Sequence, residues 1–120
     1  MVGIKYDLID AEAIFQGADW YKQFQIIDAS TKQPYDLTGY TVASAARKTY
    51  TDAAPAFIFS CSVVDPANGI IQIALTNDDT SAIPKGNYRY DVELAEPAPS
   101  TIIHKPITPS TVQVIEEYTR

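Results

Sequence analysis

The sequence predicts an all-β sandwich, and three observations lead to this fold class. The segment Gly86–Leu94 alternates apolar and charged side chains, which is the pattern of a strand with one buried face. Short segments with strand character recur along the chain, separated by turn residues about every 8–12 positions. The third observation is size, because 120 residues suffice for one hydrophobic core in one domain.

Composition narrows the class of protein. A hydrophobic fraction of 46% with 20% charged residues is typical of a soluble globular domain. The net charge is −6 and the nine basic residues are scattered, so we expect no nucleic acid as partner, and no apolar run is long enough to predict a membrane partner. The lone Cys61 precludes an internal disulfide. The beginning, Met1–Asp7, lacks the apolar run of a secretory signal, which predicts synthesis in a cytoplasm.

The first half of the chain predicts two strands after an undecided beginning. Residues 1–20 fit a helix, a strand or an extended arm, and the sequence leaves the three open. Tyr21–Asp28 is predicted to be a strand with its apolar residues on one face, followed by a turn over Ala29–Pro34. Tyr40–Arg47 is predicted to be the second strand, and Lys48–Pro55 an exposed, projecting loop.

The middle of the chain predicts a β-hairpin. Phe57–Val63 alternates, and Asp65–Gly69 supplies a turn because its Asn-Gly pair adopts positive φ easily. Ile70–Leu75 is the return strand, whose isoleucines and leucine at alternate positions are expected to face inward. The polar segment that follows this strand allows at most one short helical turn, capped by Thr76 or Asn77.

The last third supplies the final strands. Tyr88 and Tyr90 are predicted to lie in the core, with one hydroxyl bonded to a backbone carbonyl as in the tyrosine corner of Greek-key sandwiches. Pro106 and Pro109 predict that the last segment is an edge or a broken strand. Residues 1–120 are therefore expected to form a single immunoglobulin-like antiparallel β-sandwich of about seven to eight short strands.

The residue types that carry chemistry are few and poorly grouped. His104 is the single histidine and is expected to be a surface side chain rather than a catalytic base. Asp78–Asp79 lacks the spacing of a calcium loop and is expected to cap backbone amides in a turn. Asp91 and Glu93 are expected on an exposed or interface strand face, and Cys61 in the core. The sequence predicts no catalytic residue, no metal, no cofactor and no enzyme.

Aromatic residues are the most informative side chains for binding. Eight tyrosines and one tryptophan are many for this length, and such residues are enriched in β cores and at protein interfaces. Trp20 and Tyr21 form one aromatic corner, and Tyr50 and Asp52 lie in the Lys48–Pro55 loop. These four residues are our predicted partner-binding residues, and a role in packing alone stays open for each aromatic residue.

Several segments, read together, resemble a known class of proteins: Phe15–Phe24, Pro34–Tyr40, Arg47 and Gly86–Leu94. They are similar to small β-sandwich virion proteins of tailed bacteriophages, including the N-terminal domain of baseplate upper proteins. The resemblance covers roughly residues 14–120. Its most specific part is Asp36–Tyr40 followed later by the Tyr-x-Tyr-Asp strand, and Thr111–Val114 and Thr119–Arg120 also match. Pro106–Ser110 departs from those proteins, which tend to carry a glycine and a smoother strand there.

The resemblance implies a non-enzymatic structural protein of a virion, an adaptor or attachment module in the tail, baseplate or fibre region. It would bind other virion proteins and occur in multiple copies or as a homo-oligomer. A capsid decoration (cement) protein is the first alternative. The second is a carbohydrate-binding module in which Trp20, Tyr21 and Tyr50 would stack on sugar rings.

Overall fold

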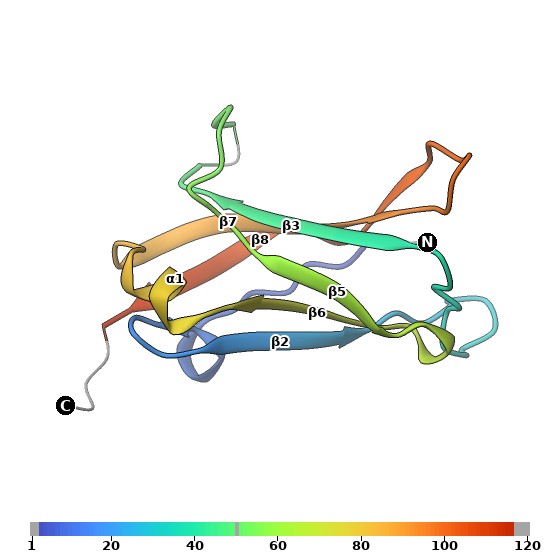
Figure 1. The fold of residues 1–120 in the computed structure, drawn as a ribbon, viewed down its shortest axis with the longest axis horizontal. Coiled ribbons are helices and arrows are strands. Elements are labelled where there is room, and N and C mark those ends of the chain that lie inside the picture. The colour runs from blue at the N-terminus through green and yellow to red at the C-terminus, as the bar shows by residue number, and fades with distance from the viewer. Residues whose placement is uncertain (1–2, 50, 117–120) are drawn as a thin grey trace.

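The computed structural model describes residues 3–49 and 51–116. These residues form two β-sheets that pack face to face, with strand orders β1-β8-β7-β3-β4 and β2-β6-β5 (Figure 1). The strands are β1 Ile14–Phe15, β2 Trp20–Gln25, β3 Thr41–Arg47, β4 Phe57–Ile58, β5 Ser60–Asp65, β6 Ile70–Leu75, β7 Gly86–Ala95 and β8 Ile103–Ile115. The helical elements are α1 Asn77–Ser81 and the 3-10 turns η1 Asp10–Glu12 and η2 Pro66–Asn68. The predicted all-β sandwich is confirmed.

The strand order is that of an immunoglobulin-like sandwich. The sheet β2-β6-β5 corresponds to strands B, E and D of that fold, and β8-β7-β3 corresponds to G, F and C. All pairings among these strands are antiparallel. The short β1 differs, because it pairs with β8 in parallel.

The core lies between the sheets, and alternate residues of β6 and β7 supply seven of its buried apolar side chains. The residues on these two strands that were predicted to face inward are all buried: Ile71, Ile73, Leu75, Tyr88, Tyr90, Val92 and Leu94. Burying one such aliphatic side chain stabilises a fold by about 1.5–3 kcal/mol. The two strands therefore supply much of the energy that holds the sheets together.

Both core tyrosines bond to backbone carbonyls. The Tyr88 hydroxyl donates to Pro84 O at 2.7 Å, just before β7 begins. This contact reaches back a few residues along the chain at the entrance to the strand that corresponds to F, as a tyrosine corner does. The Tyr90 hydroxyl donates to Tyr6 O at 2.5 Å and so joins β7 to the N-terminal segment. The predicted hydroxyl-to-carbonyl bond is confirmed.

The predicted hairpin and helical turn are present. Gly69 follows η2 with φ +68, the left-handed conformation expected of the Asn-Gly turn. The Thr76 hydroxyl caps α1 by accepting from Asp79 N at 3.2 Å. The strand predicted over Phe57–Val63 divides at Phe59, however, because β4 belongs to one sheet and β5 to the other. The chain thereby closes one side of the sandwich.

β8 is a continuous strand of 13 residues with neighbours on both sides, so the prediction of an edge or broken strand is wrong. Its register with β7 shifts between Tyr90 and Val92 and again between Val92 and Leu94. Pro109 lies in the first bulge and Pro106 in the second. A bulged residue need not donate to the ladder, which explains how two prolines fit inside a paired strand.

The N-terminal segment, residues 3–9, is an extended chain beside β8, followed by η1 and β1. Ile4 N donates to Pro106 O at 2.9 Å, and Leu8 N donates to Thr111 O at 2.8 Å. Bridges at these two positions are parallel, like the β1 pairing. Residues 3–9 thus run extended along β8 and are joined to it by isolated bridges rather than as a further strand of the sheet.

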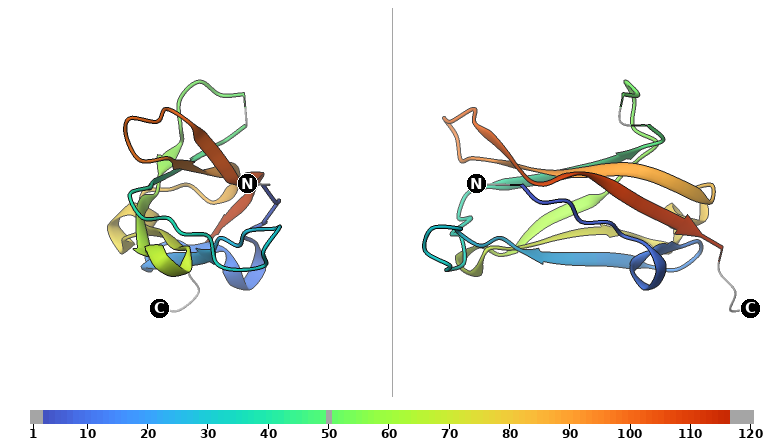
Figure 2. Two further views of the ribbon diagram at one scale, coloured as in Figure 1. Left: turned by 90° about the vertical axis from the view of Figure 1, so that its right-hand side faces the viewer. Right: turned by 180° about the vertical axis from the view of Figure 1, so that it is seen from behind.

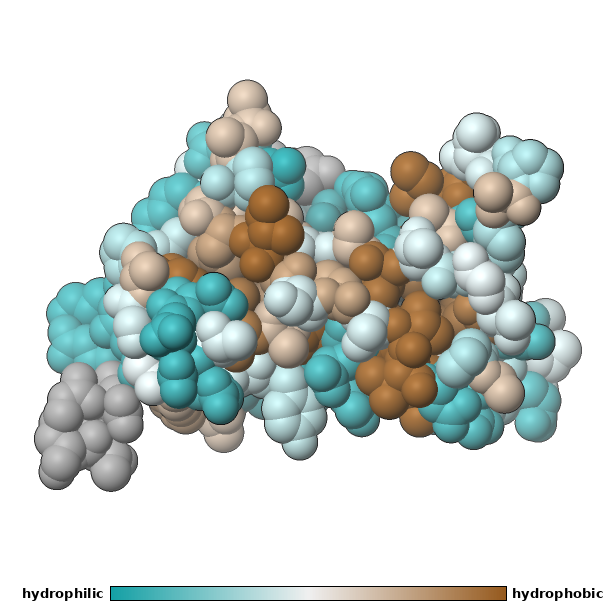
Figure 3. Space-filling view, in the orientation of Figure 1, coloured by the Kyte–Doolittle hydropathy of each residue, from teal (hydrophilic) through white to brown (hydrophobic). Residues whose placement is uncertain are grey.

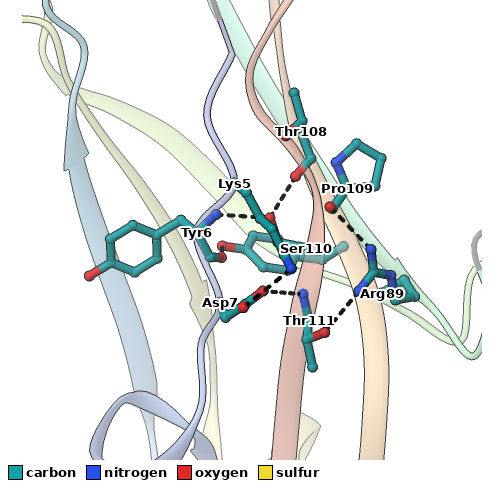
Figure 4. Close-up of polar contacts among 9 residues, drawn as sticks. Lys5, Tyr6, Asp7, Arg89, Thr108, Pro109, Ser110 and Thr111 are labelled. Carbon is teal, nitrogen blue, oxygen red and sulfur yellow. Dashed lines mark hydrogen bonds and ion pairs between the residues drawn. The ribbon is translucent and has the colours of Figure 1, made fainter.

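Side-chain contacts fasten the N-terminal segment to the bulged part of β8 (Figure 4). Tyr6 N donates to Ser110 Oγ at 2.9 Å, and Asp7 Oδ1 accepts from Thr111 N at 3.0 Å. Arg89 Nη1 donates to Thr111 Oγ1 at 2.9 Å from the other side. Side chains therefore replace ladder hydrogen bonds that the bulge interrupts. None of the described helices is long and apolar enough to span a membrane.

Candidate interaction surfaces

Trp20 and Tyr21 begin β2, and consecutive strand residues point to opposite faces. The Trp20 ring packs on the Phe59 ring with centroids 5.6 Å apart, and its Nε1 donates to Glu12 O at 3.2 Å. The Tyr21 side chain is 67% exposed. The predicted aromatic corner therefore offers Tyr21 to a partner, while Trp20 serves largely to pack the core.

This arrangement affects the carbohydrate alternative. Stacking on one sugar chain requires aromatic rings that share a face, and Trp20 and Tyr21 do not share one. Tyr50, the third predicted ring, lies outside the residues that the structure describes. The described aromatic residues of the corner thus form no common stacking platform.

The loop between β3 and β4 projects from the five-stranded sheet (Figure 1). Its described residues 48–49 and 51–56 are exposed, as predicted. The Asp52 carboxylate accepts from Thr49 Oγ1 at 2.8 Å and from Thr49 N at 3.1 Å, and these bonds lower the pKa of Asp52. Arg47 Nε donates to Asp52 O at 3.1 Å. Asp52 therefore shapes the loop, and its contact with a partner stays a prediction.

A second projection, which the sequence patterns did not indicate as a site, joins β7 to β8 at the other end of the same sheet (Figure 1). Ile102 and Ile103 there are both more than half exposed. At its base His104 Nε2 lies 2.6 Å from Glu96 Oε2 and Ser100 Oγ donates to Glu96 Oε1 at 3.0 Å. These contacts lower the pKa of Glu96. His104 is thus half-buried and paired with Glu96. The sequence signal that could have pointed to this projection is an apolar pair beside a proline-rich turn.

Exposed apolar side chains also lie on β4 and β5, the two strands between which the chain changes sheets. Ile58 on β4 is 67% exposed and Val64 on β5 is 49% exposed. Hydrophobic surface is visible on this face of the molecule, over β5 and above it (Figure 3). The period-two pattern placed Ile58 on the polar side of its strand, but its size and exposure make it a candidate contact.

The outer face of the five-stranded sheet carries an ion-pair cluster. Lys105 Nζ lies 2.8 Å from Asp91 Oδ2 and 3.4 Å from Glu93 Oε1. Asp91 lies on this outer face but is buried there, so the expectation that it would meet water is wrong, whereas Glu93 is partly exposed as expected. Lys105 belongs to a bulge of β8 opposite Glu93, and from there its side chain lies against Asp91.

The other residues considered for chemistry have structural contacts. Asp79 accepts from Thr76 N at 3.1 Å, which is the capping role predicted for that turn. Cys61 is half-buried, and burial raises the pKa of its thiol. Within residues 3–49 and 51–116, no group of three His, Cys, Asp or Glu side chains is placed to hold a metal ion.

Both outer strands of the three-stranded sheet have a free side. β2 and β5 each pair with β6, and neither has a second strand beside it among the described residues. Free sheet edges expose backbone donors and acceptors that can pair with another chain. No protein-family model matches this chain, and no curated protein matches it. Its function is therefore inferred from the sandwich, its free edges and its exposed side chains.

Proposed function

We propose that this protein is a non-enzymatic structural module of a tailed-phage virion, an adaptor that joins other proteins in the tail, baseplate or fibre region. The observation that carries the proposal is that β2 and β5 leave two sheet edges uncovered in the described part of a well-packed sandwich. Such edges suit a module that is held by neighbouring subunits. The phage context comes from the resemblance of Phe15–Phe24 and Gly86–Leu94 to virion proteins.

The exposed side chains support the same role. Tyr21, Ile58 and Ile102 are large, exposed and placed at a strand start, a sheet-switching strand and a projecting turn. Aromatic and aliphatic anchors of this kind dominate the energy of protein interfaces. A module that contacts several neighbours at once needs contact groups on several sides, and these residues provide them.

The test is incorporation of a Tyr21→Ala variant into particles of the phage that encodes the chain. Tyr21 is largely exposed, so we expect the stability of the isolated protein to change by less than about 0.5 kcal/mol. Loss of an interface anchor of about 2 kcal/mol should lower incorporation markedly at limiting protein. Gln33→Ala, in the exposed turn after β2, is the matched control and should incorporate normally.

Copy number in purified particles separates the alternatives. Tens of copies or fewer support an adaptor in the tail region, whereas hundreds would indicate capsid decoration. Absence of the protein from particles would refute a virion role. Normal incorporation of Tyr21→Ala would refute the aromatic corner as a contact.

A further inference from the structure

The free side of β2 borders an apolar groove of about 590 Å³. The groove opens between β2 and the N-terminal segment, which lie side by side when the molecule is seen from behind (Figure 2). Its apolar walls are formed by Ile4, Tyr6, Phe24, Ile26, Pro106 and Ile107. Ile4 and Ile27, at its margins, are 58% and 44% exposed. Large apolar side chains therefore meet water where the sandwich stays open.

The backbone of β2 is ready to pair along this groove. Ile26 N donates to Gly69 O and Ile26 O accepts from Tyr35 N, both at 2.8 Å, so the peptide groups of Ile26 are bonded on the side of β2 that pairs with β6. In an antiparallel pair, alternate residues bond to the neighbour and the residues between them point away. Gln23, Gln25 and Ile27 therefore direct their N–H and C=O groups to the free side, where no described residue accepts or donates.

A strand added beside Gln23–Ile27 would point every second side chain into the groove. Neighbouring strands lie about 4.8 Å apart with side chains alternating between faces, so the inward side chains would follow the row formed by Phe24 and Ile26. Apolar side chains at alternate positions would bury Ile4 and fill the space beside Ile107. The groove thus favours an extended segment with apolar side chains at alternate positions.

The charges around the groove further restrict which kind of segment can bind there. Its lining contains two lysines and no carboxylate, in a chain whose net charge is −6. Lys22 is paired with Glu12 at 2.6 Å, whereas Lys32 is exposed and has no carboxylate partner among the described residues. A second copy of this same edge would bring further lysines to the groove, which is unfavourable. A segment that carries carboxylates would instead meet Lys32 favourably.

We propose that the β2 edge and its groove bind an extended segment of another protein that alternates apolar side chains and carries acidic residues. The segment adds a strand to the three-stranded sheet, with its apolar side chains against Phe24 and Ile26 and a carboxylate near Lys32. The inference deepens the adaptor role and rests on it. Peptide binding is measured on the purified protein and incorporation on particles, so either can fail alone.

The test uses two short synthetic peptides that alternate valine and threonine, one flanked by glutamates and the other by lysines. Fluorescence anisotropy gives the affinity, and backbone amide shifts in NMR give the location. We expect the acidic peptide to bind at least about tenfold more tightly than the basic one. The amides of Gln23, Gln25 and Ile27 should shift most. Lys32→Glu should reverse the preference.

Gln25→Pro removes an outward-facing donor on a free edge, where proline is tolerated, so the fold should survive and binding should be lost. Gln25→Ala keeps the donor and should bind normally. Equal affinity for both peptides, shifts confined to β5, or full binding by a folded Gln25→Pro variant would overturn the proposal. A dimer that Gln25→Pro dissociates would overturn it in favour of a second copy as occupant.

Discussion

Two buried tyrosines make the polar contacts that are most specific to this sandwich. Tyr88 bonds to Pro84 within the turn that leads into β7, whereas Tyr90 bonds to Tyr6, far away in sequence. Burial raises the pKa of both phenols. Alternation in the sequence predicted that both rings are buried, because period two identifies the inward face. It did not predict the carbonyl that Tyr90 bonds to, because that partner comes from a segment of weak pattern.

Tyr90→Phe should destabilise the protein by about 1–2 kcal/mol, because the half-buried Tyr6 carbonyl loses its donor. The N-terminal segment should also loosen, which hydrogen exchange would show as faster exchange at Ile4 and Leu8. Tyr88→Phe is the matched control, since its hydroxyl bonds elsewhere. Unchanged exchange at Ile4 and Leu8 in Tyr90→Phe would contradict this role.

Glu12 joins three elements through one carboxylate oxygen. Glu12 Oε2 accepts from Lys22 Nζ at 2.6 Å and from Tyr6 OH at 2.7 Å. The bond from Lys22, with that from Tyr6, lowers the pKa of Glu12 below its ordinary value of 4.5. A lowered pKa in the folded state stabilises the fold above that ordinary value, and the contribution disappears as the pH falls through the folded value.

Glu12→Gln should therefore reduce stability at pH ~7 by less than about 1 kcal/mol, since the pair is partly exposed. At pH ~3, below the ordinary value of 4.5, the difference from the unchanged protein should shrink, because the contribution fades as the pH falls toward the lowered pKa of Glu12 in the folded state. Urea unfolding at the two pH values measures both effects. A difference that stays constant with pH would show that the charge of Glu12 contributes nothing.

At the scale of elements, the sequence predicted strands best where apolar and polar side chains alternate and where turn residues mark the ends of the strand. The strands over Tyr40–Arg47, Ile70–Leu75 and Gly86–Leu94 agree with β3, β6 and β7 within a residue or two. β8 was misjudged, because bulges form through pairing with β7 and leave no local pattern. The division of β4 from β5 at Phe59 was missed for the same reason, since one alternating run serves two sheets.

Turns illustrate the same division between local and distant causes. The Asn-Gly pair predicted the positive φ of Gly69 from local chemistry alone. What surrounds Gly69 is set by the fold: an added Cβ would lie 2.6 Å from Ile26 O and 2.7 Å from Tyr35 O. Thr80 is a further example, because this fully buried residue of α1 bonds to Gly17 N and Ala18 O, and no sequence pattern indicated it.

Gly69→Ala should consequently cost more than the roughly 1 kcal/mol of placing alanine at positive φ. Gly39→Ala is the matched control, with φ +82 and a close contact to the side chain of Pro97 rather than to backbone. Thermal unfolding should rank Gly69→Ala as the less stable variant. Equal melting temperatures would show that the backbone around Gly69 relaxes freely.

At the scale of the whole molecule, the sandwich is closed on one side and open on the other. The β4–β5 crossing joins the sheets on the closed side, and the groove between β2 and the N-terminal segment lies on the open side. The predicted site residues mark only part of the exposed surface: Tyr21 is available, Asp52 shapes its loop, and Trp20 packs inward. The groove arises from segments far apart in sequence, so no local pattern could reveal it, whereas the Ile102 projection is local and could have been recognised from its apolar pair beside a proline-rich turn.

The adaptor role makes a direct prediction about location. An electron-microscopy map of the intact phage particle should contain a sandwich of about 45 × 30 × 22 Å in the tail, baseplate or fibre-attachment region, with Tyr21 or the β2 edge against a neighbouring protein. Density for the sandwich on the capsid surface, or a particle without the protein, would contradict the proposed role.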